Sequence, residues 1–120
     1  MNQVRLKRIQ SVVYRELGDI IAAIGRENYP GKLLSVSEVR ITPDLSIAKV
    51  YISIYPTKDA EEIFRDIQYN KNKIRYEFGN RVRHQLRKIP QLQFYLDPTM
   101  ENLEKIDKLL KKSQEKPNNK

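Results

Sequence analysis

Cationic side chains are concentrated in residues 71–88, where seven Lys or Arg residues accompany a single carboxylate, Glu77. Cations held this close on one surface repel one another by roughly a few tenths of a kcal/mol per pair. A phosphate backbone would reverse the sign of that interaction and release its own counterions on binding. Arginine can also stack on an unpaired base and bind two phosphate oxygens at once. The segment therefore indicates a nucleic-acid-binding surface.

The apolar residues of this segment predict that the cations share one exposed helical face. Apolar residues recur every three or four positions from Ile74 to Ile89, which predicts one helix that ends at Pro90. The opposite side of the helical wheel carries a ridge made of Lys73, Asn80, Arg83, His84 and Arg87. The candidate RNA-binding residues of this helix and its flanks are Lys71, Lys73, Arg75, Arg83, Arg87 and Lys88. A solvated helix face, or a surface for an acidic protein or lipid, remains the alternative.

A second excess of positive charge lies in residues 1–26, which hold five Lys or Arg and two carboxylates. Residues 3–26 read as an amphipathic helix, with an apolar stripe of Leu6, Ile9, Val13, Leu17, Ile20 and Ile24. Arg5, Lys7 and Arg8 near its start are candidates for a supporting role in RNA binding. A transit peptide or a membrane-surface helix is an alternative, against which Glu16 and Asp19 argue.

The sequence offers no support for catalysis or for a metal site. There is no cysteine and one histidine, His84, which we expect at the rim of a binding surface rather than in a catalytic centre. No glycine-rich phosphate loop or nucleophile–base pair is visible. The carboxylates of residues 59–66 lack the spacing of a metal-binding loop. We expect no enzyme activity, no cofactor, no metal and no small-molecule substrate.

The 120 residues have a mass of 14.2 kDa, a net charge of +8 and a hydrophobic fraction of 39%. This length has room for one hydrophobic core, so we assign residues 1–112 to a single domain. Residues 113–120 contain no apolar residue, which predicts a disordered polar tail. No apolar run is long enough to span a membrane, and we expect no membrane partner.

The middle of the chain reads as a hairpin followed by two helices. Residues 33–42 and 47–55 alternate apolar and polar side chains, which predicts two strands with one buried face. Residues 59–69 predict a helix capped by Thr57 or Asp59. The helical pattern is then interrupted by a kink at Asn70, Lys71 and Asn72, because asparagine tolerates left-handed backbone and can cap through its side chain.

The last part of the chain predicts a third strand, in which Leu92, Phe94 and Leu96 share one face. Residues 100–112 then predict an amphipathic helix whose inner face consists of Leu103, Ile106, Leu109 and Leu110. Three strands with helices on one face make an α+β sandwich. On the other face, Tyr51, Tyr55 and Tyr95 could stack unpaired bases, or pack against one another or beneath the last helix.

Two groups of residues carry a resemblance to a known family. One is the run Val39-x-Ile41-x-Pro43-Asp44-Leu45-x-x-Ala48-Lys49-Val50-Tyr51-Ile52-Ser53. The other is Ile74-Arg75 followed by Arg87-x-x-Pro90-x-Leu92-x-Phe94-x-x-Asp97. With the N-terminal helix, they make residues 3–110 resemble the ribosome-binding factor A family. In place of the family's usual Ala-x-Gly kink, this chain has Asn70-Lys71-Asn72.

This resemblance implies a single type II KH-like domain, in agreement with the predicted order of elements. It also implies a cytoplasmic, monomeric assembly factor that binds the free small (30S) ribosomal subunit and its 16S rRNA near the 5′-terminal helix. Such a factor acts late in subunit maturation, performs no chemistry of its own and is tied to growth in the cold. The alternatives are a general KH-like RNA-binding protein and a protein-interaction module for an acidic partner.

Overall fold

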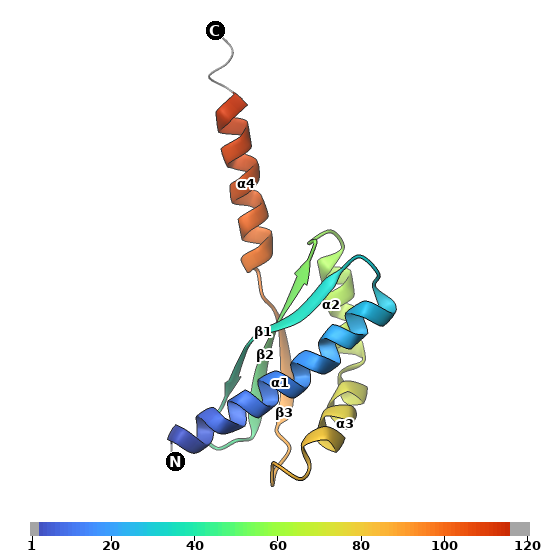
Figure 1. Ribbon diagram of the computed structural model, residues 1–120, viewed down its shortest axis with the longest axis vertical. Coiled ribbons are helices and arrows are strands. Elements are labelled where there is room, and N and C mark those ends of the chain that lie inside the picture. Colours follow the sequence, from blue (N-terminus) through green and yellow to red (C-terminus); the bar gives the residue numbers. More distant parts are fainter. Residues whose placement is uncertain (1–2, 116–120) are drawn as a thin grey trace.

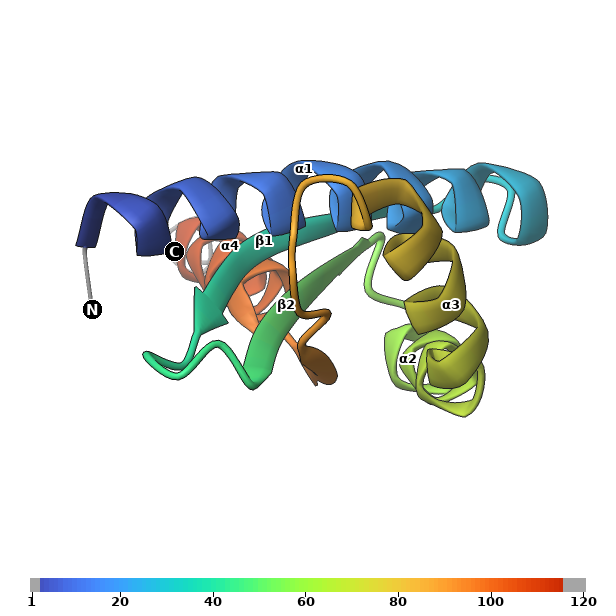
Figure 2. The ribbon, with the colours of Figure 1, turned by 90° about the horizontal axis from the view of Figure 1, so that it is seen from below.

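The N-terminal helix, α1 (Gln3–Asn28), packs along one face of a three-stranded sheet (Figures 1 and 2). The computed structural model describes the backbone of residues 3–115 and the side chains of residues 4–112. The predicted apolar stripe faces the sheet, and Val13, Leu17 and Ile20 are fully buried. Near the end of α1, a Cβ on Gly25 would lie 3.1 Å from the Cβ of Leu34. A glycine at this position therefore lets the helix approach the sheet closely.

The sheet has the order β1-β2-β3, with β1 (Leu33–Ile41), β2 (Ile47–Tyr55) and β3 (Gln91–Leu96). The strands β1 and β2 form an antiparallel hairpin, whereas β3 pairs parallel to β2. The pairing of β1 shifts between Val36 and Glu38, so that one extra residue bulges from the strand. The three strands predicted from the alternation of side chains are thus confirmed.

The helices α2 (Ala60–Tyr69) and α3 (Lys71–Val82) meet at Asn70, where the kink was predicted. Asn70 has φ −95°, so its backbone is not left-handed. Its side-chain amide donates to the Asp66 carbonyl at 2.8 Å, and makes no side-chain hydrogen bond to the start of α3. The kink is therefore the capped end of α2, followed directly by a new helix. Asp59 is the N-cap residue of α2, one of the two that were predicted, but its side chain makes no capping hydrogen bond.

The helix α3 ends at Val82, well before the Pro90 stop predicted from the sequence. Residues 83–90 form turns and irregular backbone that lead into β3. Leu86 is still buried, because its amide donates to the Val82 carbonyl and the chain makes one more turn before it leaves the helix axis. This turn preserves the three-to-four spacing of buried residues, which explains why the sequence pattern looked like a longer helix.

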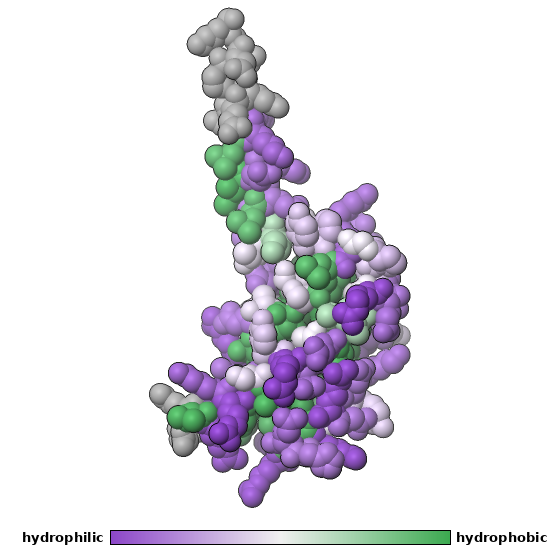
Figure 3. Space-filling view, in the orientation of Figure 1, coloured by the Kyte–Doolittle hydropathy of each residue, from purple (hydrophilic) through white to green (hydrophobic). Residues whose placement is uncertain are grey.

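The C-terminal helix, α4 (Thr99–Glu115), extends away from the body of the molecule (Figure 1). The apolar residues expected on its inner face are exposed, with 52–67% of their surface accessible, and these are Leu103, Ile106, Leu109 and Leu110. Figure 3 shows an apolar stripe along one side of α4. The prediction that this stripe is buried is wrong, because only the first turns of α4 contact the body, where Glu104 accepts a hydrogen bond from the Thr57 hydroxyl at 2.7 Å. Of the predicted disordered tail, residues 113–115 belong to α4, and residues 116–120 lie outside the described residues.

The helices α1, α2 and α3 bury one face of the sheet and leave the other face uncovered by them (Figure 2). On the open face, the rings of Tyr51 and Tyr95 stack with centroids 5.2 Å apart, and both Tyr55 and Tyr95 are exposed. The order of elements confirms the predicted α+β, type II KH-like fold. In the stretch from Gln3 to Glu115, no helix is long and apolar enough to cross a membrane.

Candidate nucleic-acid interface

A cleft of about 440 Å³ lies at the end of the molecule opposite α4. Three segments meet there, namely the start of α1, the turn between β1 and β2, and the loop of residues 83–90 (Figure 1). Four cations line the cleft: Arg5, Arg8, Arg87 and Lys88. Apolar side chains form much of the remaining lining, among them Ile9, Leu45 and Leu86. We call this site the basic cleft.

Charge distinguishes the basic cleft, because no residue that lines it carries a carboxylate. Arg5 and Arg8 lie one turn apart on α1 and therefore project from the same side of the helix. Arg87 and Lys88 are exposed side chains of the loop that follows α3. The structure thus joins the two cationic segments of the sequence into one surface, which can accept phosphate groups.

Arg75 fixes the loop that carries Arg87 and Lys88. Its Nη2 donates to the Ile89 carbonyl at 3.0 Å, and its Nε donates to the Pro90 carbonyl at 3.2 Å. Because a guanidinium holds its donors in a rigid fork, these two bonds fix the loop along α3. Arg75 was predicted to bind RNA. The structure instead places its donors on backbone carbonyls, so we assign it a positioning role.

The turn between β1 and β2 forms another wall of the basic cleft. Asp44 Oδ1 accepts hydrogen bonds from the Ser46 hydroxyl at 2.7 Å, the Thr42 hydroxyl at 2.8 Å and the Ser46 amide at 3.1 Å. The bonds from Ser46 and Thr42 lower the pKa of Asp44 to about 2, with a smaller contribution from the positive charge of Lys88. The Asp44 carboxylate is thus ionised at neutral pH and already occupied by the turn.

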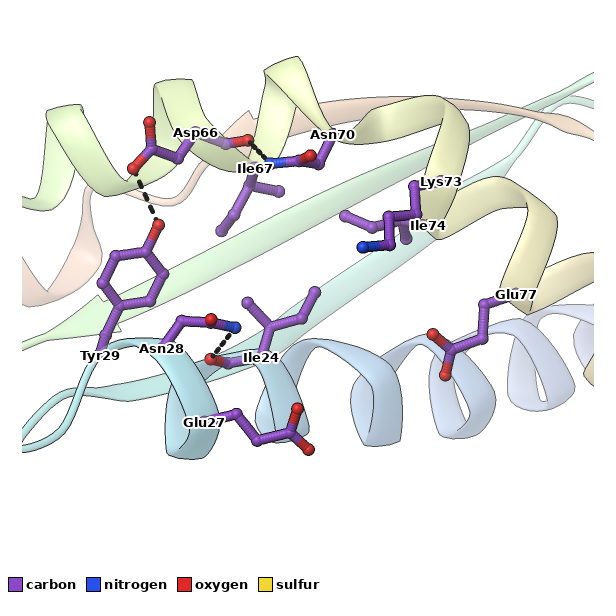
Figure 4. Close-up of a pocket in the computed structure, with 10 residues that line it drawn as sticks. All are labelled: Ile24, Glu27, Asn28, Tyr29, Asp66, Ile67, Asn70, Lys73, Ile74 and Glu77. Carbon is purple, nitrogen blue, oxygen red and sulfur yellow. Dashed lines mark hydrogen bonds between the residues drawn. The ribbon is translucent and has the colours of Figure 1, made fainter.

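Lys73 lies at a different site, a cavity of about 470 Å³ between α1, α2 and α3 that we call the kink cavity (Figure 4). Its side chain points into this cavity, whose lining also contains three carboxylates: Glu27, Asp66 and Glu77. The Tyr29 hydroxyl donates a hydrogen bond to Asp66 at 2.9 Å. The pKa of the Tyr29 phenol is raised, mainly by its burial and also by this contact with Asp66. The surplus of negative charge disfavours phosphate here, so we expect RNA to bind at the basic cleft and not at the kink cavity.

The other cations of residues 71–88, and Lys7 of α1, are dispersed. Arg83 is exposed after the end of α3, where its Nε donates to His84 Nε2 at 3.4 Å. Lys71 begins α3 at the kink, and Lys7 is exposed on α1, and neither lines the basic cleft. Arg81 lies within 3.9 Å of each of three carboxylates, those of Glu16, Asp19 and Glu77.

Part of the positive charge on residues 71–88 is therefore neutralised by carboxylates, as at Arg81, or holds the loop in place, as at Arg75. The pattern of charges along the chain did not predict that Leu45 and Ile9 line the basic cleft, because both come from segments far from the ridge. The turn chemistry of residues 42–46 was visible in the sequence, but its proximity to the loop of residues 83–90 depends on the parallel pairing of β3 with β2.

Comparisons with known proteins agree with this architecture. The family model for ribosome-binding factor A matches residues 5–110. The chain is 46% identical over 108 residues to ribosome-binding factor A of Christiangramia forsetii, a match that covers 89% of this chain and 82% of that protein. It is 41% identical over 111 residues to the factor of Flavobacterium psychrophilum, covering 92% of this chain and 85% of that protein.

Two solved structures share the fold. The crystal structure of ribosome-binding factor A from Thermus thermophilus matches with a TM-score of 0.62 at 23% identity, covering 76% of this chain and 94% of that chain. A Thermus thermophilus homology model fitted into the cryo-EM map of a 30S–RbfA complex matches with a TM-score of 0.61 at 25% identity, covering 76% of this chain and 93% of that chain. With a family match that spans nearly all the described residues, the chain belongs to the ribosome-binding factor A family.

Proposed function

We propose that this protein is an assembly factor that binds the free small (30S) ribosomal subunit through its 16S rRNA, near the 5′-terminal helix. It acts in the cytoplasm late in subunit maturation and leaves the finished subunit. It performs no catalysis itself. Membership of the ribosome-binding factor A family supports this role, as does the likeness to a relative fitted into a 30S complex.

The observation that carries the proposal is the basic cleft. Four cations from two distant segments converge on one cavity without a carboxylate in its lining. Mutual repulsion makes such a cluster costly in the free protein, and phosphate groups remove that cost. The cleft lies at the opposite end of the molecule from α4, so a bound RNA can reach it without contacting that helix (Figure 1).

Sedimentation through a sucrose gradient tests the proposal. The protein is mixed with free small subunits, free large subunits or intact ribosomes at fixed ionic strength. We expect co-migration with free small subunits, and little with the other two particles. Equal binding to all three particles would reduce the interaction to a general attraction between a basic protein and RNA.

A variant with Arg8→Gln and Lys88→Gln should lose most of the co-migration with small subunits. The matched control is Lys108→Gln with Lys112→Gln, which removes the same charge from α4. Retention of binding by the cleft variant and loss by the control would place the interface on α4 instead.

A further inference from the structure

Leu45, at the tip of the turn between β1 and β2, has a left-handed backbone with φ +63°. Residues other than glycine, asparagine and aspartate rarely adopt this backbone conformation, because the Cβ approaches the following carbonyl oxygen. A leucine at such a position is therefore strained, and the surrounding structure has to hold it there.

Hydrogen bonds within the turn hold Leu45 in place. The Leu45 amide donates to the Thr42 carbonyl at 2.8 Å, and Asp44 binds the hydroxyl groups of Thr42 and Ser46 on either side. The strain thus occurs within a closed network rather than in a loose loop. Its result is that the apolar Leu45 side chain is held against the hydrophobic core at the tip of the hairpin, with part of its surface left accessible.

The Leu45 side chain is half-buried and lines the basic cleft together with Ile9 and Leu86. A surface that bound only phosphate groups would gain nothing from an apolar wall, since phosphate is fully hydrated and charged. A nucleotide, in contrast, has both parts, a charged phosphate and a base with a large apolar face. The volume of about 440 Å³ is within the range of small-ligand sites.

We propose that the basic cleft takes one unpaired nucleotide, with its base against Leu45 and Ile9 and its flanking phosphates on Arg5, Arg8, Arg87 and Lys88. The inference rests on the proposed RNA-binding function and specifies the form of RNA that the cleft selects. In a duplex, both faces of a base are covered by its neighbours, so a duplex offers only phosphates to this site. Single-stranded RNA therefore binds more tightly than duplex RNA of the same sequence, and Leu45 provides the difference.

Fluorescence anisotropy with a labelled twelve-nucleotide RNA, single-stranded or annealed to its complement, tests the proposal over a series of KCl concentrations. The variant Leu45→Asn removes the apolar wall with a residue that tolerates left-handed backbone. We expect about fivefold weaker binding of the single strand, with an unchanged salt dependence and unchanged duplex binding. The matched control Leu45→Met keeps the apolar surface and should bind like the wild type.

A second measurement needs no variant. An oligonucleotide of abasic ribose phosphates keeps the charges and lacks the bases, so the wild type should bind it several-fold more weakly with the same salt slope. Equal affinity for the abasic and the normal strand, or equal losses for single strand and duplex in Leu45→Asn, would overturn the nucleotide site. Those results would leave the proposed function intact, because that function is tested separately by co-sedimentation with free small subunits, free large subunits and intact ribosomes.

Discussion

Arg75 illustrates how the role of a single residue depends on its partners. In the sequence it is one of seven cations in residues 71–88, whereas in the structure both of its hydrogen bonds go to carbonyls of Ile89 and Pro90. These bonds stabilise the loop that presents Arg87 and Lys88. We therefore assign Arg75 a positioning role, in which it holds the loop in place instead of contacting RNA itself.

Replacement of Arg75 should consequently affect the stability of the fold. We expect Arg75→Met to lower the free energy of unfolding by about 1–3 kcal/mol, because it leaves two carbonyls without their charged donor. Urea denaturation followed by circular dichroism measures this change. The control Arg83→Met removes an exposed guanidinium and should change stability by about 0.5 kcal/mol or less. Equal stabilities of the two variants would contradict the assigned role.

The Asp44 carboxylate gives a pH-dependent signature to the turn. Its pKa falls from the usual 3.8 to about 2 in the folded protein, so the ionised form stabilises the fold. This contribution is complete above the unfolded-state pKa and is lost as the pH falls through the folded-state value. We expect Asp44→Asn to be less stable than the wild type at pH 7, and the gap to narrow between pH 4 and pH 2.

Urea unfolding midpoints at pH 7, pH 4 and pH 2.5 measure this gap. Asp107→Asn, an exposed carboxylate on α4 paired with Lys111, serves as the reference variant. A gap for Asp44→Asn that is as wide at pH 2.5 as at pH 7 would show that the carboxylate does not stabilise the turn through its charge.

Among the elements, α4 differs most from expectation. Its periodic apolar residues predicted a buried face, yet in the structure that face is exposed along the helix beyond its first turns (Figure 3). Amphipathic spacing predicts which side chains share a face, but it cannot say whether the body of the molecule lies next to that face. The position of α4 is set by Asp97, whose Oδ2 accepts from Ser37 at 2.6 Å and whose Oδ1 accepts from the Thr99 amide at 2.9 Å.

Leucine-to-alanine substitutions distinguish the exposed face of α4 from the core. We expect Leu109→Ala to change the free energy of unfolding by about 0.5 kcal/mol or less, because its side chain is 67% exposed. Leu92→Ala in β3 should cost about 2–5 kcal/mol, because Leu92 is buried and its truncation leaves a cavity. Urea unfolding of the two variants provides the comparison. Similar losses would mean that α4 packs against the body.

The other elements followed closely from sequence periodicity. The strand β2 has the predicted bounds, and α1 extends two residues beyond its predicted end at residue 26. The end of α3 could not be predicted in this way, because the turn after Val82 keeps Leu86 buried at helical spacing. Local patterns thus fixed the type of each element, whereas the ends depended on contacts such as those of Arg75 with the loop.

At the scale of the whole molecule, the charged side chains that give the net charge of +8 are distributed unevenly over the surface. The kink cavity and the basic cleft have similar volumes, but carboxylates predominate in the first and only cations carry charge in the second. The sequence predicted Arg5, Arg8, Arg87 and Lys88 as members of two separate segments. These four residues form one site because of the fold, and counting charges along the chain cannot show this.

The central claim, that the basic cleft is the RNA-binding site, is tested most directly by the salt dependence of RNA affinity. The variant with Arg5→Gln and Arg87→Gln is compared with Lys105→Gln and Lys111→Gln, which removes equal charge from α4. Each lost phosphate contact lowers the slope of log affinity against log salt by about 0.7 for a single strand. We predict a slope about 1.4 shallower for the cleft variant and an unchanged slope for the α4 variant. Equal slopes for both variants and the wild type would contradict the claim.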